Sequence, residues 1–142
     1  MTQLREMMSK NVASVSPQDN VYQAASLMKE HNVGSIPVVE NGRICGMVTD
    51  RDLVLRALAE QKNEQMTVGD VMTDQVVTGS PEMSVDEASS LMAQNQIRRL
   101  PVVENNQLVG MVSLGDMAVR QPHVNEAGQA LSNISEPSSP QM

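Results

Sequence analysis

Two short segments of the chain carry the side chains best suited to holding a ligand. They are residues 46–52, GMVTDRD, and residues 110–116, GMVSLGD. Each runs from a glycine through two apolar residues to a hydroxyl, Thr49 or Ser113, and reaches an aspartate three residues later, Asp52 or Asp116. We expect a strand to pass into a helix here. A hydroxyl beside the free N–H groups of a helix start can bind phosphate, and a carboxylate one turn in can accept both hydroxyls of a ribose. The spacing therefore suits a nucleotide.

The same spacing also has a purely structural interpretation. A Ser or Thr followed three residues later by an acidic residue is close to a capping box, in which the hydroxyl caps the helix and the carboxylate reaches back to the chain. Thr49 with Asp52, and Ser113 with Asp116, fit this pattern. The two interpretations are compatible, and both stay open at this point.

The two segments belong to an internal repeat of 64 residues. Residues 8–56 align with residues 72–120 without a gap, and the strings PVVEN and GMV are identical in both copies. Agreement over some fifty positions is the signature of a repeated supersecondary unit. The repeat predicts that the two copies fold alike, and that halves of this size pack on each other.

Each copy is predicted to run strand, helix, strand, strand, helix. Apolar spacing predicts the first helix over Val21–His31, with Asn20 as its N-cap, and Asn41-Gly42 predicts a hairpin between two β-branched runs. In copy one the strands are expected over 12–15, 36–39 and 44–48, and the second helix over 53–59. In copy two the strands are expected over 76–78, 100–103 and 108–112, and the helices over 85–95 and from Gly115.

Composition excludes several classes of function. The net charge of −7 argues against binding to a nucleic-acid backbone, and no apolar run is long enough to span a membrane. The N-terminus lacks the basic-then-apolar pattern of a signal peptide, so a cytoplasmic location is expected. Cys45, the single cysteine, lies in an apolar run and is expected to be a buried, inert thiol. No acid–base pair, activated nucleophile or metal-ligand spacing is recognisable, so the chain is not expected to be an enzyme and no metal site is predicted.

The two copies together resemble a pair of CBS domains, also called a Bateman module. The resemblance covers roughly residues 3–120 and depends on the apolar-Pro-Val-Val strand and the Gly-x-x-Thr/Ser-x-x-Asp junction, each present twice. It implies an α/β (α+β) fold of two tandem β-α-β-β-α repeats, packed pseudo-symmetrically through small mixed sheets. The predicted boundaries are 1–64 and 65–121 for the repeats, and 122–142 for a C-terminal extension, expected to be a disordered tail.

The resemblance also implies a function. In this family, clefts between the repeats bind adenosyl ligands such as AMP, ADP, ATP and S-adenosylmethionine. The implied role is that of a stand-alone ligand sensor, in which an adenosine nucleotide is a regulatory ligand and no cofactor is required. A homodimer and a separate effector protein are the implied macromolecular partners.

Site residues follow from the resemblance by position. Asp52 and Asp116 would hold ribose hydroxyls, and Thr49 and Ser113 would contact phosphate or ribose. The cleft with Asp52 would be completed from copy two by Thr78, Ile97, Arg98 and Arg99. The cleft with Asp116 would be completed from copy one by Ser14, Val33, Gly34 and Ser35. Pro37 and Pro101 would help to wall the base.

The copies differ at the positions that set the charge of these clefts. Arg98 and Arg99 align with Gly34 and Ser35 of copy one, and Arg51 aligns with Gly115 of copy two. Arginine suits phosphate recognition. The Asp52 cleft is therefore predicted to be cationic and to prefer a phosphorylated adenosine. The alternative for the arginine pair is a solvated strand edge or a salt bridge to a partner subunit.

Two other functions remain alternatives. An interaction or scaffold module with vestigial clefts would need the junction residues only as helix caps. Nucleic-acid binding is also known in the family, although the acidic balance of the chain disfavours it.

Overall fold

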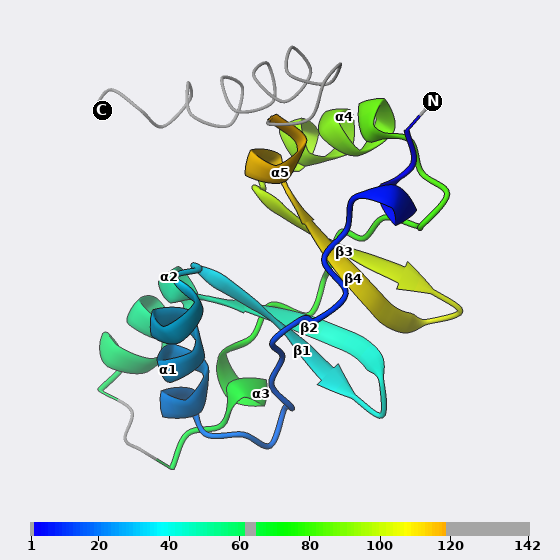
Figure 1. Ribbon diagram of the computed structural model, residues 1–142. Helices are drawn as coiled ribbons and strands as arrows, with labels where there is room; N and C mark the ends of the chain where they lie inside the picture. The colour runs from blue at the N-terminus through cyan, green and yellow to red at the C-terminus, as the bar shows by residue number, and fades with distance from the viewer. Residues whose placement is uncertain (1, 62–64, 119–142) are drawn as a thin grey trace, which may run out of the picture. The chain divides into compact units, whose positions relative to one another are not determined.

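The computed structural model describes residues 2–61 and 65–118, and these divide into two compact units (Figure 1). One unit contains residues 12–76 together with residues 106–108, and we call it the copy-one unit. The other, the copy-two unit, contains residues 2–11, 77–105 and 109–118 of the described chain. Predictions for residues 122–142 lie outside the described residues.

The copy-one unit is a β-hairpin with helices packed against it. It comprises α1 (Val21–His31), β1 (Ser35–Glu40), β2 (Arg43–Thr49), α2 (Asp50–Leu53), η2 (Val54–Leu58) and α3 (Val68–Val71). In Figure 1, α1 and the α2–η2 segment lie side by side at one end of the hairpin. The η2 turn is a π-helix, in which the amide of Ala59 donates to the carbonyl of Val54 at 2.8 Å. Such wide turns occur often at functional sites.

Local sequence explains where these elements begin and end. The predicted N-cap is confirmed, because the Asn20 side chain accepts from the amide of Tyr22 at 2.7 Å. α1 ends at Asn32, which adopts the left-handed conformation. Asn41 and Gly42 both have positive φ, as the predicted two-residue hairpin turn requires. Before this turn, the β1–β2 register is interrupted by a bulge between Val38 and Val39.

The copy-two unit repeats this plan. It comprises η1 (Leu4–Glu6), α4 (Val85–Asn95), β3 (Arg99–Glu104), β4 (Gln107–Ser113) from residue 109 onward, and α5 (Leu114–Ala118). Ser84 caps α4, and Gln96 ends it in the left-handed conformation that Asn32 adopts in the other copy. The β3–β4 turn uses Asn105 and Asn106, both with positive φ. The predicted boundaries of both long helices are confirmed.

The segment that precedes each copy packs against the other copy. Leu4 of η1 is fully buried in the core around α4, and its amide donates to the carbonyl of Met83 at 2.9 Å. In turn, the amide of Val68 in α3 donates to the carbonyl of Asp19 at 2.7 Å. The compact units therefore exchange these leading segments, whereas the sequence boundaries at 1–64 and 65–121 follow the repeat.

β1 and β2 pair antiparallel, from Ser35 with Thr49 to Glu40 with Arg43. Gln107, which belongs to the copy-one unit, pairs with Arg43 of β2. The strands predicted over 12–15 and 76–78 are wrong. The structure has a single parallel bridge at Val15, with Val38, and another just after the second segment, at Gly79 with Val102. A Ser-Pro pair follows each bridging residue, and proline has no N–H with which to continue a ladder.

Two separate apolar clusters form the cores, and neither contains an aromatic side chain. The copy-one cluster includes Val21, Met28, Ile36 and Val48, and the copy-two cluster includes the matching residues Val85, Met92, Leu100 and Val112. Methionine adapts to irregular gaps, which suits a chain without Trp or Phe.

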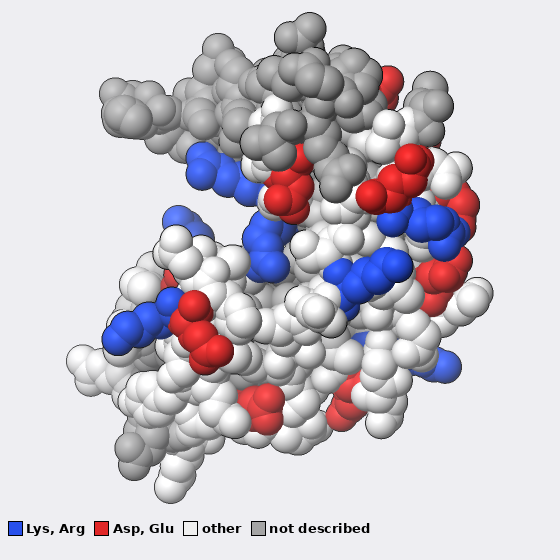
Figure 2. Space-filling view, in the orientation of Figure 1, with Lys and Arg blue, Asp and Glu red and all other residues white. Residues whose placement is uncertain are grey.

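The surface mixes both signs of charge. On the face shown in Figure 2, basic and acidic side chains are interspersed over much of the visible surface. Among residues 2–61 and 65–118, no helix is long and apolar enough to cross a membrane.

Candidate functional site

The copy-one junction is a complete capping box. The Thr49 hydroxyl accepts from the amide of Asp52 at 3.0 Å, and the Asp52 carboxylate accepts from the amide of Thr49 at 3.0 Å. The structural interpretation of the motif is therefore confirmed in this copy. Asp52 is only 8% exposed, which is unusual for an acidic side chain.

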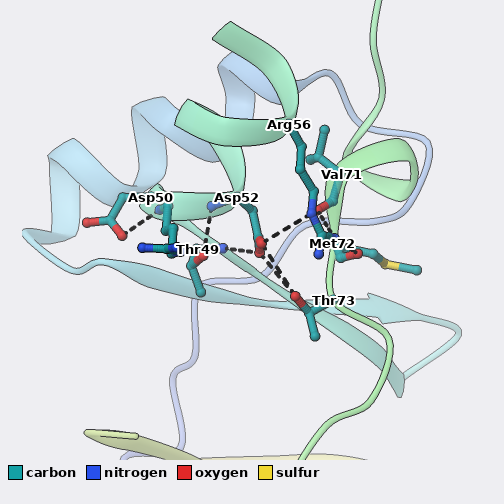
Figure 3. Close-up of polar contacts among 8 residues, drawn as sticks. Thr49, Asp50, Asp52, Arg56, Val71, Met72 and Thr73 are labelled. Atoms are coloured by element: carbon teal, nitrogen blue, oxygen red, sulfur yellow. Dashed lines mark hydrogen bonds and ion pairs between the residues drawn. The ribbon is translucent and has the colours of Figure 1, made fainter. Parts of the chain in front are cut away.

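Asp52 has two further neighbours that the sequence did not single out (Figure 3). The Thr73 hydroxyl lies 3.4 Å from both carboxylate oxygens, and the Arg56 Nε lies 4.0 Å from Oδ1. Thr73 belongs to the segment that leads into copy two, and Arg56 follows Asp52 by one helical turn. A sequence signal existed for both: the repeat places Ser9 at the position of Thr73 and Arg120 at the position of Arg56.

Arg56 joins the junction to the leading segment of copy two. Its Nη1 donates to the carbonyls of Val71 and Met72, at 3.1 Å and 3.2 Å. These carbonyls are at the C-terminal end of α3, where a cation meets both orphan acceptors and the negative end of the helix. Arg56 therefore fixes the end of α3 beside Asp52.

The copy-two junction is more open. The Ser113 hydroxyl accepts from the amide of Asp116 at 3.0 Å, so the helix cap is present here as well. Asp116 itself is exposed, whereas its counterpart Asp52 is buried. Leu114 and Met117 on the same helix are buried and hold α5 in the copy-two core. The two aspartates therefore share a motif but differ in surroundings.

Arg98 and Arg99 lie in the same unit as Ser113 and Asp116. The carbonyl of Arg98 accepts from the amide of Leu114 at 3.0 Å, which holds the start of β3 against the start of α5. Burial lowers the pKa of the Arg99 guanidinium, and the negative charge of Asp116 opposes that shift. Arg99 is half-buried and still cationic at neutral pH. The copy-two unit thus places a cation, a hydroxyl and an exposed carboxylate at one junction.

Gly34 and Ser35 occupy the matching positions in the copy-one unit. The carbonyl of Gly34 accepts from the amide of Asp50 at 2.9 Å, and Ser35 pairs with Thr49 in the β1–β2 register. Each of these segments therefore contacts the junction of its own copy. Their predicted roles at the junction of the other copy, including that of Arg98 and Arg99 at Asp52, stay predictions.

The other predicted site residues are distributed over both units. Pro37 and Pro101 are buried in β1 and β3. Val33, Thr78 and Ile97 are partly buried, while Arg51 and Ser14 are exposed. Ser14 lines a surface pocket of about 460 Å³ with Tyr22 and other residues of the copy-one unit.

Cys45 is partly buried rather than fully buried, because it lies at the bulge in the β1–β2 register. Its thiol donates to the carbonyl of Val38 at 3.4 Å. Burial, and next the negative charge of Glu40, raise the pKa of the thiol. The thiolate is therefore disfavoured, as expected for an unreactive cysteine.

Known proteins share this architecture. The chain is 53% identical over 135 residues to the CBS domain-containing protein YhcV of Bacillus subtilis (strain 168), covering 95% of this chain and 96% of that protein. The crystal structure of Hypoxic Response Protein I, with two coordinated zinc ions, matches 85% of this chain and all of that chain with a TM-score of 0.78 at 32% identity. No group of three or more His, Cys, Asp or Glu that could hold a metal is found among the described residues of the present chain.

A second solved structure contains adenosyl ligands. The CBS domain pair of protein MJ0100, in complex with 5′-methylthioadenosine and S-adenosyl-L-methionine, matches 83% of this chain and 94% of that chain. The TM-score is 0.72 at 27% sequence identity. The family model of the CBS domain matches residues 4–58 and again residues 68–121. The chain therefore belongs to the CBS-domain family and carries two CBS domains in tandem.

Proposed function

We propose that the chain is a regulatory module that binds an adenosyl nucleotide and transmits its occupancy to a separate effector protein. The observation that carries the proposal is the copy-two junction, where the Ser113 hydroxyl, the exposed Asp116 carboxylate and the Arg99 cation lie in one unit. A carboxylate suits a ribose diol, and a cation suits a phosphate. The adenosyl ligands of the MJ0100 domain pair support the choice of ligand class.

This assignment differs from the prediction based on alignment alone, which gave the arginines to Asp52. Arg99 lies close enough to Asp116 for the carboxylate to influence its pKa. We therefore favour Asp116 as the ribose residue of the phosphate-binding site. The Asp52 junction, in the copy-one unit, is contacted by Thr73 and Arg56 of that unit.

Calorimetric titration tests the proposal directly. AMP, ATP, S-adenosylmethionine and adenosine are titrated into the wild type, Arg99→Gln, Asp116→Asn and Asp52→Asn, with Arg43→Gln as a control for loss of one positive charge. Because Arg99→Gln removes a charged hydrogen bond to the phosphate, we expect it to lower the affinity for AMP about tenfold or more and to leave the affinity for adenosine nearly unchanged. Asp116→Asn should lower the affinity for both ligands.

Two results would contradict parts of the proposal. Failure of every adenosyl compound to bind the wild type would remove the sensor function and favour a scaffold role. Loss of AMP binding in Asp52→Asn but not in Asp116→Asn would restore the original assignment of the arginines to the Asp52 cleft.

A homodimer is the second part of the proposal. Among the described residues, the large apolar side chains that are exposed all lie on α1 and η2: Tyr22, Val54, Leu55 and Leu58. None of these four is charged, whereas the whole chain carries a net charge of −7 that opposes self-association elsewhere on its surface. The copy-two position that matches Tyr22 is the charged residue Asp86, so Tyr22 is an apolar contact that copy two lacks. A twofold contact between two copy-one faces would bury it.

A further inference from the structure

The Asp52 carboxylate faces the leading segment of copy two. The Thr73 hydroxyl lies 3.4 Å from each of its two oxygens, and the amide of Thr49 donates to Oδ2 at 3.0 Å (Figure 3). With these neighbours only 8% of Asp52 is exposed. A ribose diol that binds Asp52 would donate to the same two oxygens that the Thr73 hydroxyl contacts. The ribose and the Thr73 hydroxyl would therefore compete for this carboxylate.

The backbone of Thr73 is also tied to copy one. Its amide and carbonyl exchange two hydrogen bonds with Met47 of β2, at 2.8 Å and 2.9 Å. Gly46 permits this close approach, because a Cβ there would lie 2.9 Å from the carbonyl oxygen of Thr73. The junction and the leading segment are therefore in direct contact through backbone as well as side chains.

Arg56 is the second tie between these parts. Its guanidinium spans from Asp52, at 4.0 Å, to the carbonyls of Val71 and Met72 at the end of α3. The distance to the carboxylate is long for an ion pair, and the Arg56 side chain is 54% exposed. The ion pair between Arg56 and Asp52 is therefore weak enough for a ligand to displace it.

We propose that Thr73 and Arg56 form a latch that competes with the ribose of an adenosyl ligand for Asp52. With the latch closed, the segment 71–73 is held on copy one. A ribose that binds Asp52 displaces the Thr73 hydroxyl, weakens the Arg56 contact and releases this segment, which leads directly into copy two. Thr73 and Arg56 are positioning residues: they act through Asp52 and stabilise the free state only.

The inference rests on the proposed function, and it gives that function a direction of regulation. Ligand binding at Asp52 and docking of residues 71–73 oppose each other, so by linkage each weakens the other by the same factor. A latch that exists in the free state lowers the apparent affinity of the Asp52 junction. Removing the latch must then raise this affinity.

The test uses the Asp116→Asn background, so that binding reports on the Asp52 junction. AMP and 2′,3′-dideoxy-AMP are titrated into this variant and into the same variant carrying Thr73→Val, Thr73→Ser or Arg56→Gln. Lys29→Gln, an exposed cation on α1, is the charge control. We expect Thr73→Val and Arg56→Gln to raise AMP affinity about threefold to tenfold, and Thr73→Ser and Lys29→Gln to leave it unchanged. None should change the affinity for the dideoxy ligand, which lacks the competing hydroxyls.

A lowered or unchanged AMP affinity in Thr73→Val would overturn the latch, and so would an equal effect on both ligands. Amide hydrogen exchange of the ligand-free protein tests the latch separately. Thr73→Val should speed exchange at the amides of Met47 and Thr73, and AMP should do the same in the wild type. If no adenosyl compound binds, the proposed function and the competition fail together. Unchanged exchange in Thr73→Val would overturn the latch without touching the proposed function.

Discussion

The contrast between Asp52 and Asp116 predicts unequal losses of stability when each is replaced by alanine in the absence of ligand. Asp52→Ala removes the carboxylate from the amide of Thr49 and from the hydroxyl of Thr73, and leaves both donors without this acceptor. Loss of half a capping box costs about 1 kcal/mol. A further bond to a buried carboxylate at a long distance adds about 1 kcal/mol or slightly more.

The ion pair with Arg56 adds little to this sum. Its atoms are 4.0 Å apart and the guanidinium is 54% exposed, so its share is under about 0.5 kcal/mol. The expected loss for Asp52→Ala is therefore about 2–3 kcal/mol. Asp116→Ala keeps the bond from its backbone amide to Ser113 and removes only an exposed charge near a helix start. We expect it to cost about 0.5 kcal/mol.

Urea denaturation followed by circular dichroism, without nucleotide, measures both losses. The two variants are each other's control, since they make the same chemical change at equivalent positions of the repeat. A loss for Asp116→Ala as large as that for Asp52→Ala would refute the reasoning. So would a loss below about 0.5 kcal/mol for Asp52→Ala, because the buried contacts of Asp52 would then contribute nothing measurable.

Three further predictions follow from other features. Gly46→Ala and Gly110→Ala should each destabilise the ligand-free protein by about 1–3 kcal/mol, because the new Cβ would meet the carbonyl oxygens of Thr73 and Ser9 at 2.9 Å; denaturation curves that match the wild type would contradict this close approach. Cys45 should react with iodoacetamide more slowly than free cysteine at pH 8, and faster as the pH rises through its raised pKa, as a rate profile against pH would show. Since that folded pKa exceeds the ordinary value of 9.0, the thiol contributes stability below pH 9 that is lost at higher pH. Leu58→Asp should shift sedimentation toward the monomer, while Asp86→Asn, at the copy-two position that matches Tyr22, should not; a monomeric wild type would contradict the dimer.

Local sequence signals were sufficient to predict most of the fold. Val21–His31 and Val85–Asn95 were predictable because a capping residue precedes each helix and an apolar face runs along it. The hairpin at Asn41-Gly42 was predictable because few residue pairs favour positive φ at two successive positions. The predictions of strands over 12–15 and 76–78 failed because β-branched residues indicate only an extended chain. Pairing into a sheet also needs a neighbouring strand, whose position the local sequence does not encode.

The candidate site was predictable only in part, for a similar reason. Thr49 with Asp52 and Ser113 with Asp116 could be found from spacing, since a capping box is a local structure. The contacts of Asp52 with Thr73 and Arg56 depend on where the leading segment of copy two docks. Side chains that meet across such a contact leave no periodic signal in the sequence. Only the repeat hinted at them, through the hydroxyl of Ser9 and through Arg120.

If both junctions bind nucleotide, the difference between Asp52 and Asp116 sets the order in which they fill. If both aspartates bound a ribose with equal ease, a rising nucleotide concentration would fill both junctions together. In the proposed mechanism the exposed Asp116 meets a ligand directly, whereas Asp52 must first give up Thr73 and Arg56. Binding that needs a minor state is weakened by the fraction of that state. Titration of the wild type with AMP should therefore show two steps, with Asp116 filled first and hydrogen exchange at Met47 and Thr73 rising only with the second. Two equivalent sites, or exchange that rises with the first step, would contradict this order.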